Sequence, residues 1–268
     1  MKGLNGPLRI RTVRNETRLQ DETERPKIIG ILRKGYLRTE RILMDGRRSV
    51  FGFIVPGDLI GDIMGLGFGP AVVAATDAEI CIFEPATFRH AITTDKAIRA
   101  EVLAEVMRQH TRQLEMVWRR GALNSKERIM AFIVLAAEFM PVEPLPDGSI
   151  LLTMQVSRKD WADFCSSTLE TISRTLTYLS ERSMLRSVTP SRFLIRDMGS
   201  LAELAGLDRR EDRKGMVITD GPRSSKIENN EPISPAILAK GPSDTSLPQG
   251  AMRTGGAIRR SYNGYHAH

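Results

Sequence analysis

Residues 156–185 constrain the fold most strongly, because they contain two short helical patterns separated by a tight connection. The first helix is predicted to begin at Ser157, with Asp160 three residues later as in a capping box. Its apolar face consists of Trp161, Ala162 and Phe164. The tight connection to the next helix is Cys165-Ser166-Ser167.

The second helix is predicted to begin at Thr168, whose hydroxyl can cap it, with Glu170 in a first turn that favours carboxylates. Its buried stripe has the spacing i, i+4, i+7 and consists of Ile172, Leu176 and Leu179. Another face is polar at i, i+3, i+4 and i+7, and consists of Glu170, Ser173, Arg174 and Thr177. This arrangement is typical of a helix-turn-helix, which reads DNA with the exposed face of its second helix.

The side chains on this polar face match the edges of DNA bases. Arg174 can donate two hydrogen bonds to guanine, Glu170 can accept one from cytosine, and Ser173 can do either. Leu169 is placed for contact with a thymine methyl group. The alternative is an ordinary amphipathic helix whose solvated face carries these residues by chance, and spacing alone does not decide between the two.

The flanking sequence favours DNA binding. Residues 183–197 read as strand, turn and strand, with the turn at 189–191, and predict a wing. Residues 157–196 contain seven Lys or Arg against four Asp or Glu, and the net charge of the chain is +7, which suits a polyanionic partner. The residues expected to contact phosphates are Ser157, Arg158, Lys159, Thr168, Thr171 and Arg192.

The N-terminal part of the chain has the short strand and turn patterns of a small β domain. Residues 1–27 are polar and lack a period, so they are expected to be disordered or atypical. Residues 28–90 alternate short β-branched runs with Gly-rich turns, including the pair Asp45-Gly46, and 71–85 read as two short strands joined at 76–77. These patterns predict a partial β-roll over 28–90.

A long helical pattern covers residues 85–118, and 91–121 are assigned to a dimerisation helix. A heptad seam with spacing 4, 3, 4, 3 consists of Leu103, Met107, His110, Leu114 and Val117. A second stripe of Ile98, Val102 and Val106 is expected to face the roll. The alternative is one wide core-facing stripe in a monomer. The flanking charges are expected to be solvated, and they are Glu101, Glu105, Arg108, Arg112 and Glu115.

Two residues invite other interpretations. His110 is expected to set the register of the seam, whereas a haem ligand or a proton sensor is the alternative. Cys165, between the two short helices, is expected to be buried, with an oxidation-sensitive thiol as the alternative, and Cys81 is expected in the core. With only two cysteines, a disulfide framework and a four-cysteine metal site are excluded.

The predicted class is therefore α+β, with a partial β-roll, a long dimerisation helix and a winged helix-turn-helix over 122–205. Residues 206–268 contain eight Gly and five Pro without a sustained apolar period, which predicts a disordered tail. No phosphate-binding loop, metal-ligand cluster or nucleophile motif is found, so neither an enzyme nor a cofactor is expected. Without a secretory signal or a membrane-spanning run, a cytoplasmic protein is expected.

This order of parts, over residues 28–205, resembles the Crp/Fnr superfamily of transcription regulators. The segment ETISR at 170–174 looks like the E-x-x-S-R signature of the Fnr and FixK branches. The segments DGRR, FGFIVPGDLIG and LETISRTL look most like those of FixK-type regulators. The resemblance implies a homodimer on a palindrome of TTGA-like half-sites. It also implies activation through RNA polymerase, and control of genes for oxygen-limited respiration or nitrogen fixation.

The sequence departs from that pattern in three places. Residues 61–73 contain no arginine to neutralise a cyclic phosphate, so binding of cyclic AMP or GMP is not expected. Residues 1–80 contain no cysteine, so an iron–sulfur cluster of the Fnr kind is not supported. The strands that usually precede the position of Ile28 are not recognisable, which predicts an incomplete roll or a damaged gene start. Two alternative functions stay open: a small-molecule-sensing roll without DNA output, or a degenerate, non-functional paralogue.

Overall fold

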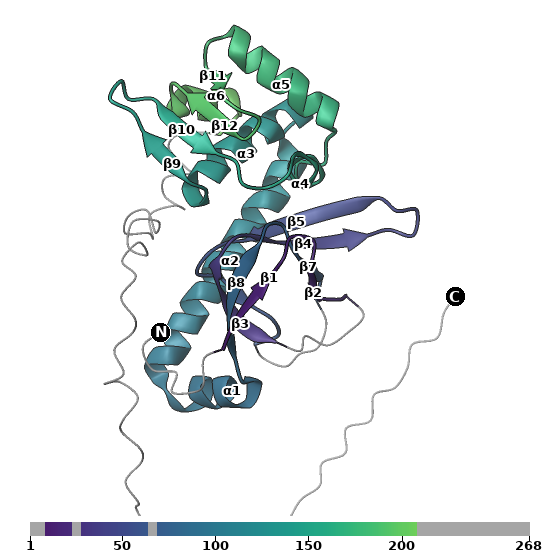
Figure 1. Cartoon of the computed structure of the whole chain (residues 1–268), viewed down its shortest axis with the longest axis vertical. Coiled ribbons are helices and arrows are strands. Elements are labelled where there is room, and N and C mark those ends of the chain that lie inside the picture. Colours follow the sequence, from purple (N-terminus) through teal and green to yellow (C-terminus); the bar gives the residue numbers. More distant parts are fainter. Residues whose placement is uncertain (1–8, 23–27, 64–68, 208–268) are drawn as a thin grey trace, which may run out of the picture. The chain divides into compact units, whose positions relative to one another are not determined.

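The computed structural model describes residues 9–22, 28–63 and 69–207 of the chain. Most of the predicted tail, 208–268, lies outside the described residues, as do residues 1–8 and 23–27 of the N-terminal segment. The described chain combines helices and strands in the predicted α+β class (Figure 1).

The roll consists of two four-stranded antiparallel sheets. The first, in spatial order, contains β1 (Arg9–Val13), β8 (Ala78–Phe83), β3 (Ile29–Lys34) and β6 (Leu59–Ile60). The second contains β2 (Arg18–Gln20), β7 (Ala71–Ala74), β4 (Leu37–Ile42) and β5 (Arg48–Ile54). Fully buried side chains of both sheets, including Leu32, Leu37 and Ile80, form the core between them.

The prediction for the N-terminal segment was wrong where the structure describes it. β1 pairs with β8 from Arg9 to Val13, and β2 pairs with β7 from Arg18 to Gln20. In β1 only Val13 is buried, so the strand lacks the alternation of apolar and polar residues that identifies strands in a sequence. The roll therefore has two strands that the sequence did not reveal, and they cover one edge of β8 and one edge of β7.

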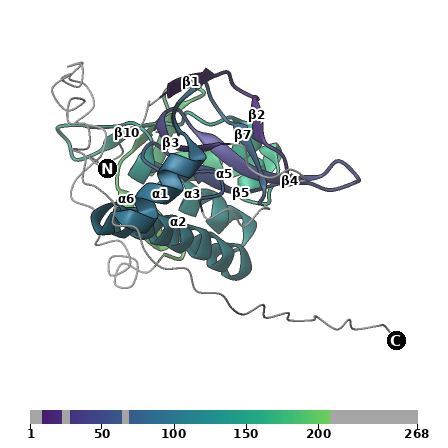
Figure 2. The same ribbon diagram turned by 90° about the horizontal axis from the view of Figure 1, so that it is seen from below.

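The turn at Asp45-Gly46 is confirmed: β4 and β5 form an antiparallel hairpin around it, with Gly46 at a positive φ of 84° that suits glycine. Both views show this hairpin projecting beyond its neighbours (Figures 1 and 2). The two strands of 71–85 are also confirmed. They lie in different sheets, however, so the turn between them is a corner of the roll and not a hairpin.

The long helical pattern forms two helices, α1 (Pro85–Thr94) and α2 (Lys96–Ala122). The break falls at Asp95, whose carboxylate accepts hydrogen bonds from the backbone N–H groups of Ala97 and Ile98 and so caps α2. Ile98 and Val102 pack on the roll as predicted, whereas the side chain of Val106 is 37% exposed.

The expectation that all flanking charges of this helix are solvated was wrong. Glu105 is buried, and the guanidinium of Arg112 lies 2.5 Å from the buried carboxylate of Asp58, which belongs to the roll. These charges face the roll because the buried side of α2 is wider than its apolar stripe.

The C-terminal part is a helical domain with a four-stranded sheet, in the spatial order β11 (Leu185–Ser187), β12 (Arg192–Ile195), β10 (Ile150–Thr153) and β9 (Val142–Pro144). Its helices are α3 (Ser125–Phe139), α4 (Arg158–Phe164), α5 (Leu169–Glu181) and α6 (Met198–Leu204). Asn124 starts α3 in a capping box with Glu127. The predicted hairpin after α5 is confirmed as β11 and β12.

Aromatic contacts join this domain to the roll. The ring of Phe53 on β5 lies 5.8 Å from that of Phe132 on α3 and 5.1 Å from that of Phe164 on α4, measured between centroids. The hydroxyl of Tyr36 donates a hydrogen bond of 3.0 Å to the carbonyl of Phe139. A few buried residues of the roll, among them Tyr36 and Val50, therefore belong to the apolar core of the helical domain.

Candidate nucleic-acid interface

The two short helices begin at their predicted capping residues, Ser157 and Thr168. The hydroxyl of Ser157 accepts a hydrogen bond from the backbone N–H of Asp160 at 3.0 Å, and that of Thr168 accepts one from Thr171 at 3.1 Å. The predicted stripe of α5 is buried and anchors this helix in the domain core: Ile172, Leu176 and Leu179. The helix-turn-helix geometry is thus set by local capping together with this apolar anchor.

The four residues predicted to read bases lie on the exposed first two turns of α5. The side chains of Glu170 and Arg174 are 71% and 79% exposed, Leu169 is 56% exposed, and Ser173 is exposed as well. A guanidinium nitrogen of Arg174 donates to the carboxylate of Glu170 at 2.6 Å. An exposed pair of this kind contributes only about 0.3–0.5 kcal/mol, so it orients Arg174 without preventing exchange for a base edge.

The residues predicted to contact phosphates differ in how free their polar atoms are. Lys159 and Thr168 are exposed, and the hydroxyls of Thr168 and Thr171 lie 2.9 Å apart at the start of α5. Ser157 is exposed, but its hydroxyl donates to the carboxylate of Asp160 at 2.9 Å. Its proton is therefore already bound inside the protein, which the sequence did not reveal.

The side chains of Arg158 and Arg192 also contact other residues of the helical domain. The guanidinium of Arg158 lies 5.1 Å from the ring centroids of Trp161 and Phe193, and it donates to the carbonyl of Pro190 in the wing turn at 3.0 Å. Burial lowers the pKa of Arg158, although a guanidinium stays charged at neutral pH. Arg192 pairs with Glu143 on β9 at 3.1 Å. Both arginines therefore stabilise the wing in addition to any role toward phosphate.

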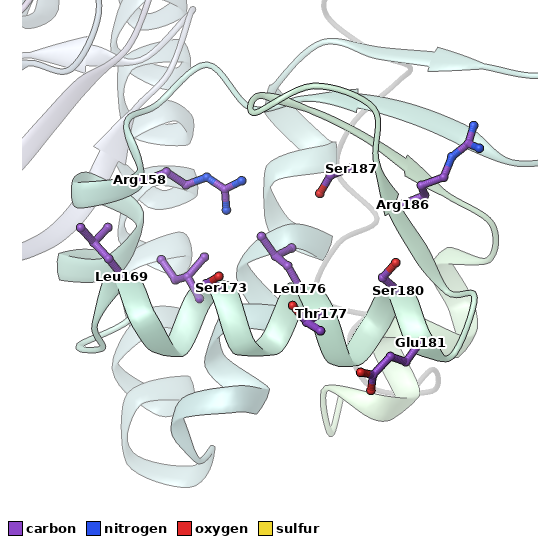
Figure 3. A pocket seen from close by; sticks show the side chains of 10 residues that line it. Arg158, Leu169, Ser173, Leu176, Thr177, Ser180, Glu181, Arg186 and Ser187 are labelled. Carbon is purple, nitrogen blue, oxygen red and sulfur yellow. The ribbon is translucent and has the colours of Figure 1, made fainter.

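A groove of about 650 Å³ runs between α5 and the wing. Figure 3 shows Arg158 and Arg186 at its opposite ends, with hydroxyl side chains of α5 between them. Sequence reasoning missed Ser180 and Ser187 here; Ser180 continues the spacing of Ser173 and Thr177 at i+7, which could have revealed it. The residues lining the groove are Arg158, Leu169, Ile172, Ser173, Leu176, Thr177, Ser180, Glu181, Arg186 and Ser187.

The predicted seam on α2 forms an exposed apolar stripe. Leu103, Met107, Leu114 and Val117 are 60%, 52%, 54% and 69% exposed, and His110 between them is also exposed. The alternative of a wide core-facing stripe is therefore wrong, because these side chains face away from the core. Exposed apolar patches of this extent on a helix are typical of interaction surfaces.

The two cysteines differ in exposure. Cys165 is 2% exposed, its thiol donates to the carbonyl of Arg128 at 3.5 Å, and burial raises its pKa to about 12. This confirms the expected burial and makes the thiol a poor nucleophile. Cys81 on β8 is only half-buried, so its assignment to the core holds in part.

Comparison with known proteins agrees with this geometry. Residues 154–185 match the family model of bacterial regulatory proteins of the crp family, and residues 10–95 match that of the cyclic nucleotide-binding domain. The second match begins within β1, in agreement with the corrected boundary of the roll.

Among curated proteins, the chain is similar to nitrogen fixation regulation protein FixK of Azorhizobium caulinodans. The two are 27% identical over 170 residues, which is 63% of this chain and 68% of the relative. FixK of Rhizobium meliloti is 31% identical over 151 residues, or 56% of this chain and 65% of the relative. Both relatives are named as regulation proteins of nitrogen fixation.

Solved structures share the fold. FixK2 from Bradyrhizobium japonicum superposes with a TM-score of 0.67 at 21% identity, and covers 74% of this chain and 96% of its own. A CRP-family transcriptional regulator from Thermus thermophilus superposes with a TM-score of 0.61 at 21% identity, and covers 73% of this chain and 96% of its own. The resemblance inferred from the sequence is confirmed: the chain is similar, in sequence and in fold, to FixK-like regulators of the Crp/Fnr family.

Proposed function

We propose that this protein binds DNA sequence-specifically as a homodimer and regulates transcription. The observation that carries the proposal is the exposed face of α5, where Leu169, Glu170, Ser173 and Arg174 project from a helix anchored in the core. Because the named relatives regulate nitrogen fixation, the target genes are those of nitrogen fixation or oxygen-limited respiration.

The base contacts follow from side-chain chemistry. Arg174 reads a guanine through two hydrogen bonds, Glu170 accepts from a cytosine amino group, and Leu169 contacts a thymine methyl. Ser173 donates or accepts beside them. A TTGA-type half-site and its complement contain all of these partners, and each good contact contributes about 1–3 kcal/mol of discrimination.

Phosphate contacts then hold the duplex against the base-reading face. Thr168 and Thr171 lie at the N-terminal end of α5, where the helix dipole also favours an anion, and Lys159 lies exposed in the first turn of α4. Arg158 and Arg186 at the ends of the groove supply positive charge beside the wing. Ser157 and Arg192 contribute after exchanging their present partners, Asp160 and Glu143.

The exposed stripe on α2 provides the dimer contact. A two-fold axis through this stripe would present two α5 helices to a palindrome, in which one half-site serves each subunit. In this proposal His110 sets the register of the seam, and the dimer activates transcription by contacting RNA polymerase in the cytoplasm. No helix in the described part of the chain is long and apolar enough to cross a membrane.

The roll supports the DNA-binding domain in this proposal without binding a cyclic nucleotide. Residues 61–73 contain no arginine that would neutralise a buried phosphate. The alternative of a degenerate paralogue depended on the missing strands, and β1 and β2 supply two of them. The exposed polar face of α5 favours DNA binding over the alternative of a small-molecule-sensing roll without DNA output.

Binding to labelled DNA tests the proposal. Fluorescence anisotropy at fixed salt would compare a TTGA–TCAA palindrome with a scrambled duplex for the wild-type chain, Arg174→Ala and Arg182→Ala. Arg182 is the matched control, because it lies at the other end of α5 and its guanidinium stacks 3.8 Å from the ring centroid of Tyr178.

We expect the wild type and Arg182→Ala to prefer the palindrome. Arg174→Ala should lose about 1–3 kcal/mol per half-site, or roughly 5- to 150-fold in affinity for one half-site. Equal affinity of the wild-type chain for both duplexes would defeat the proposal.

A further inference from the structure

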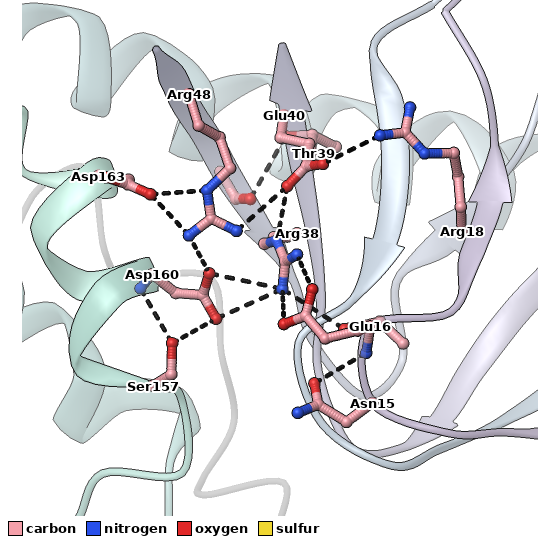
Figure 4. A network of polar contacts seen from close by, with 12 residues as sticks. Asn15, Glu16, Arg18, Arg38, Thr39, Glu40, Arg48, Ser157, Asp160 and Asp163 are labelled. Carbon is pink, nitrogen blue, oxygen red and sulfur yellow. Dashed lines mark hydrogen bonds and ion pairs between the residues drawn. The ribbon is translucent and has the colours of Figure 1, made fainter. Parts of the chain in front are cut away.

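A buried group of charged side chains joins the second sheet of the roll to helix α4. Figure 4 shows Arg38 on β4 and Arg48 on β5 facing Asp160 and Asp163 on the first helix of the helix-turn-helix. We call these four residues, with Glu16 and Glu40, the interdomain ion network. Arg38 and Asp160, which pair within it, lie 122 positions apart in the sequence, so only the tertiary structure brings them together.

Arg48 makes the shortest contacts between the two parts. One of its terminal nitrogens lies 2.7 Å from a carboxylate oxygen of Asp160 and 2.6 Å from one of Asp163. Its Nε donates to that same oxygen of Asp163 at 2.6 Å. One planar guanidinium thus holds two carboxylates that are almost one helical turn apart on α4.

Arg38 binds the other side of Asp160 and is itself fixed within the roll. Its Nη1 lies 3.4 Å from Asp160, while its Nε donates to Glu40 at 2.7 Å and its Nη2 to Glu16 at 2.5 Å. Arg38 and Asp160 are 2% and 1% exposed. These charges are therefore removed from water and depend on one another for compensation.

The network acts at the point where the DNA-binding motif begins. Asp160 accepts the hydroxyl of Ser157, which caps α4, and Trp161 beside it belongs to the same core cluster as Ile172 of α5. A displacement of Asp160 relative to the roll therefore moves α4, and α5 with it.

Energetics indicate that the network fixes geometry more than it adds stability. Each buried ion costs several kcal/mol of desolvation, and well-packed apolar residues can often replace such a pair without loss of stability. A guanidinium fork is directional, however, and a shift of about 1 Å would weaken both Arg48 contacts while leaving Asp160 buried. The rings of Phe53, Phe132 and Phe164 pack against one another at tilted angles at the same interface and resist such a shift as well.

We propose that Arg38 and Arg48 are positioning residues for DNA binding. They fix the orientation of the helix-turn-helix domain on the roll, and thereby the separation of the two α5 helices in a dimer. The inference rests on the proposed function, because spacing between half-sites matters only if two such helices read one palindrome.

The test compares Arg48→Met with Arg47→Met. The two arginines are neighbours on the same hairpin, but Arg47 is 77% exposed and pairs locally with Asp45, so it is a matched control. Affinities would be measured for the palindrome, for a single half-site, and for a palindrome lengthened by one base pair between the half-sites.

We expect Arg47→Met to behave as the wild type, with a clear loss of affinity for the lengthened palindrome. For Arg48→Met we expect the affinity for the correct palindrome to fall about tenfold or more. A domain that is flexibly joined to the dimer has a lower effective concentration at the second half-site. Its affinity for a single half-site should stay within about twofold, and its discrimination between the two palindromes should nearly vanish. A variant that was merely unstable would lose affinity for half-site and palindrome alike.

A measurement without DNA separates this inference from the proposed function. Ser180→Cys, combined with Cys81→Ser, places one spin label on each α5, and pulsed electron paramagnetic resonance gives the distance between the two labels in the dimer. We expect a narrow distance distribution for the labelled chain with both arginines intact and for its Arg47→Met variant, and a broad distribution for its Arg48→Met variant.

Several results would overturn the inference. These are equal distributions for the two arginine variants, unchanged spacing discrimination in Arg48→Met, equal loss on half-site and palindrome, or no dipolar signal because the chain is monomeric. If the wild type showed no sequence preference while the distributions still differed, the proposed function would fail, and the network would still be shown to hold the domain in place.

Discussion

Replacing Leu114 by Glu tests whether the exposed stripe on α2 holds two subunits together. Leu114 lies in the middle of the predicted seam and is 54% exposed in the single chain. In a two-fold dimer the substitution would place two carboxylates near the axis, where each loses water and faces a like charge. We expect it to produce a folded monomer.

The magnitude follows from the exposed apolar side chains. Full burial of a Val, Leu or Met side chain contributes about 1.5–3 kcal/mol, so the seam residues, which are 52–69% exposed, contribute roughly 1–2 kcal/mol each. Eight such side chains in a dimer supply roughly 8–16 kcal/mol, against an association cost of about 4–15 kcal/mol. Losing two leucine side chains and burying two carboxylates makes the free energy of association less favourable by about 4 kcal/mol or more. This weakens dimerisation by roughly a thousandfold or more.

Sedimentation equilibrium gives the dimer dissociation constant directly, and circular dichroism shows whether the variant is folded. Ala104→Glu is the control, because it adds the same carboxylate at an exposed position about 100° around the helix from Leu103. We expect the control to dimerise as the wild type does. If Leu114→Glu dimerised with unchanged affinity, or if Ala104→Glu dissociated equally, the seam would lie elsewhere.

Three further predictions concern the core, the buried thiol and the base-reading face. Trp161 is fully buried between the rings of Phe132 and Phe193, so Trp161→Ala should lower the free energy of unfolding by about 3–5 kcal/mol in urea titrations, and a change below about 1 kcal/mol would contradict this packing. Because burial raises the pKa of Cys165 to about 12, about one thiol in 10⁴ is ionised at pH 8, and iodoacetamide should modify it only after denaturation. Rapid native alkylation, read by mass spectrometry, would instead support a redox-sensitive thiol. Glu170→Gln should weaken discrimination at one base pair by about 1–3 kcal/mol while leaving affinity for scrambled DNA equal or higher, since a negative charge facing phosphate is removed. Anisotropy with single-base variants of the half-site checks this, and unchanged discrimination would exclude a base contact.

Much of the DNA-reading part could be predicted from the sequence, because its signals act over a few residues. The caps at Ser157 and Thr168 and the buried stripe of α5 define the two helices, and the turn at 189–191 defines the wing. Each of these depends on hydrogen bonds or side chains within about one or two helical turns. The apolar stripe on α2 was likewise predicted from its repeat, and its role as a dimer seam stays a prediction.

The partners of charged residues were decided only by the tertiary structure. Asp160 looked like one half of a capping box, yet its carboxylate meets Arg38 and Arg48 of the roll. Arg112 looked solvated, yet it pairs with the buried Asp58. A carboxylate gives the same local pattern whether it faces water or an arginine far away in the sequence, because burial is a property of the assembled fold. The strands β1 and β2 were missed for the same reason: their stability comes from pairing with β8 and β7, and their own alternation is weak.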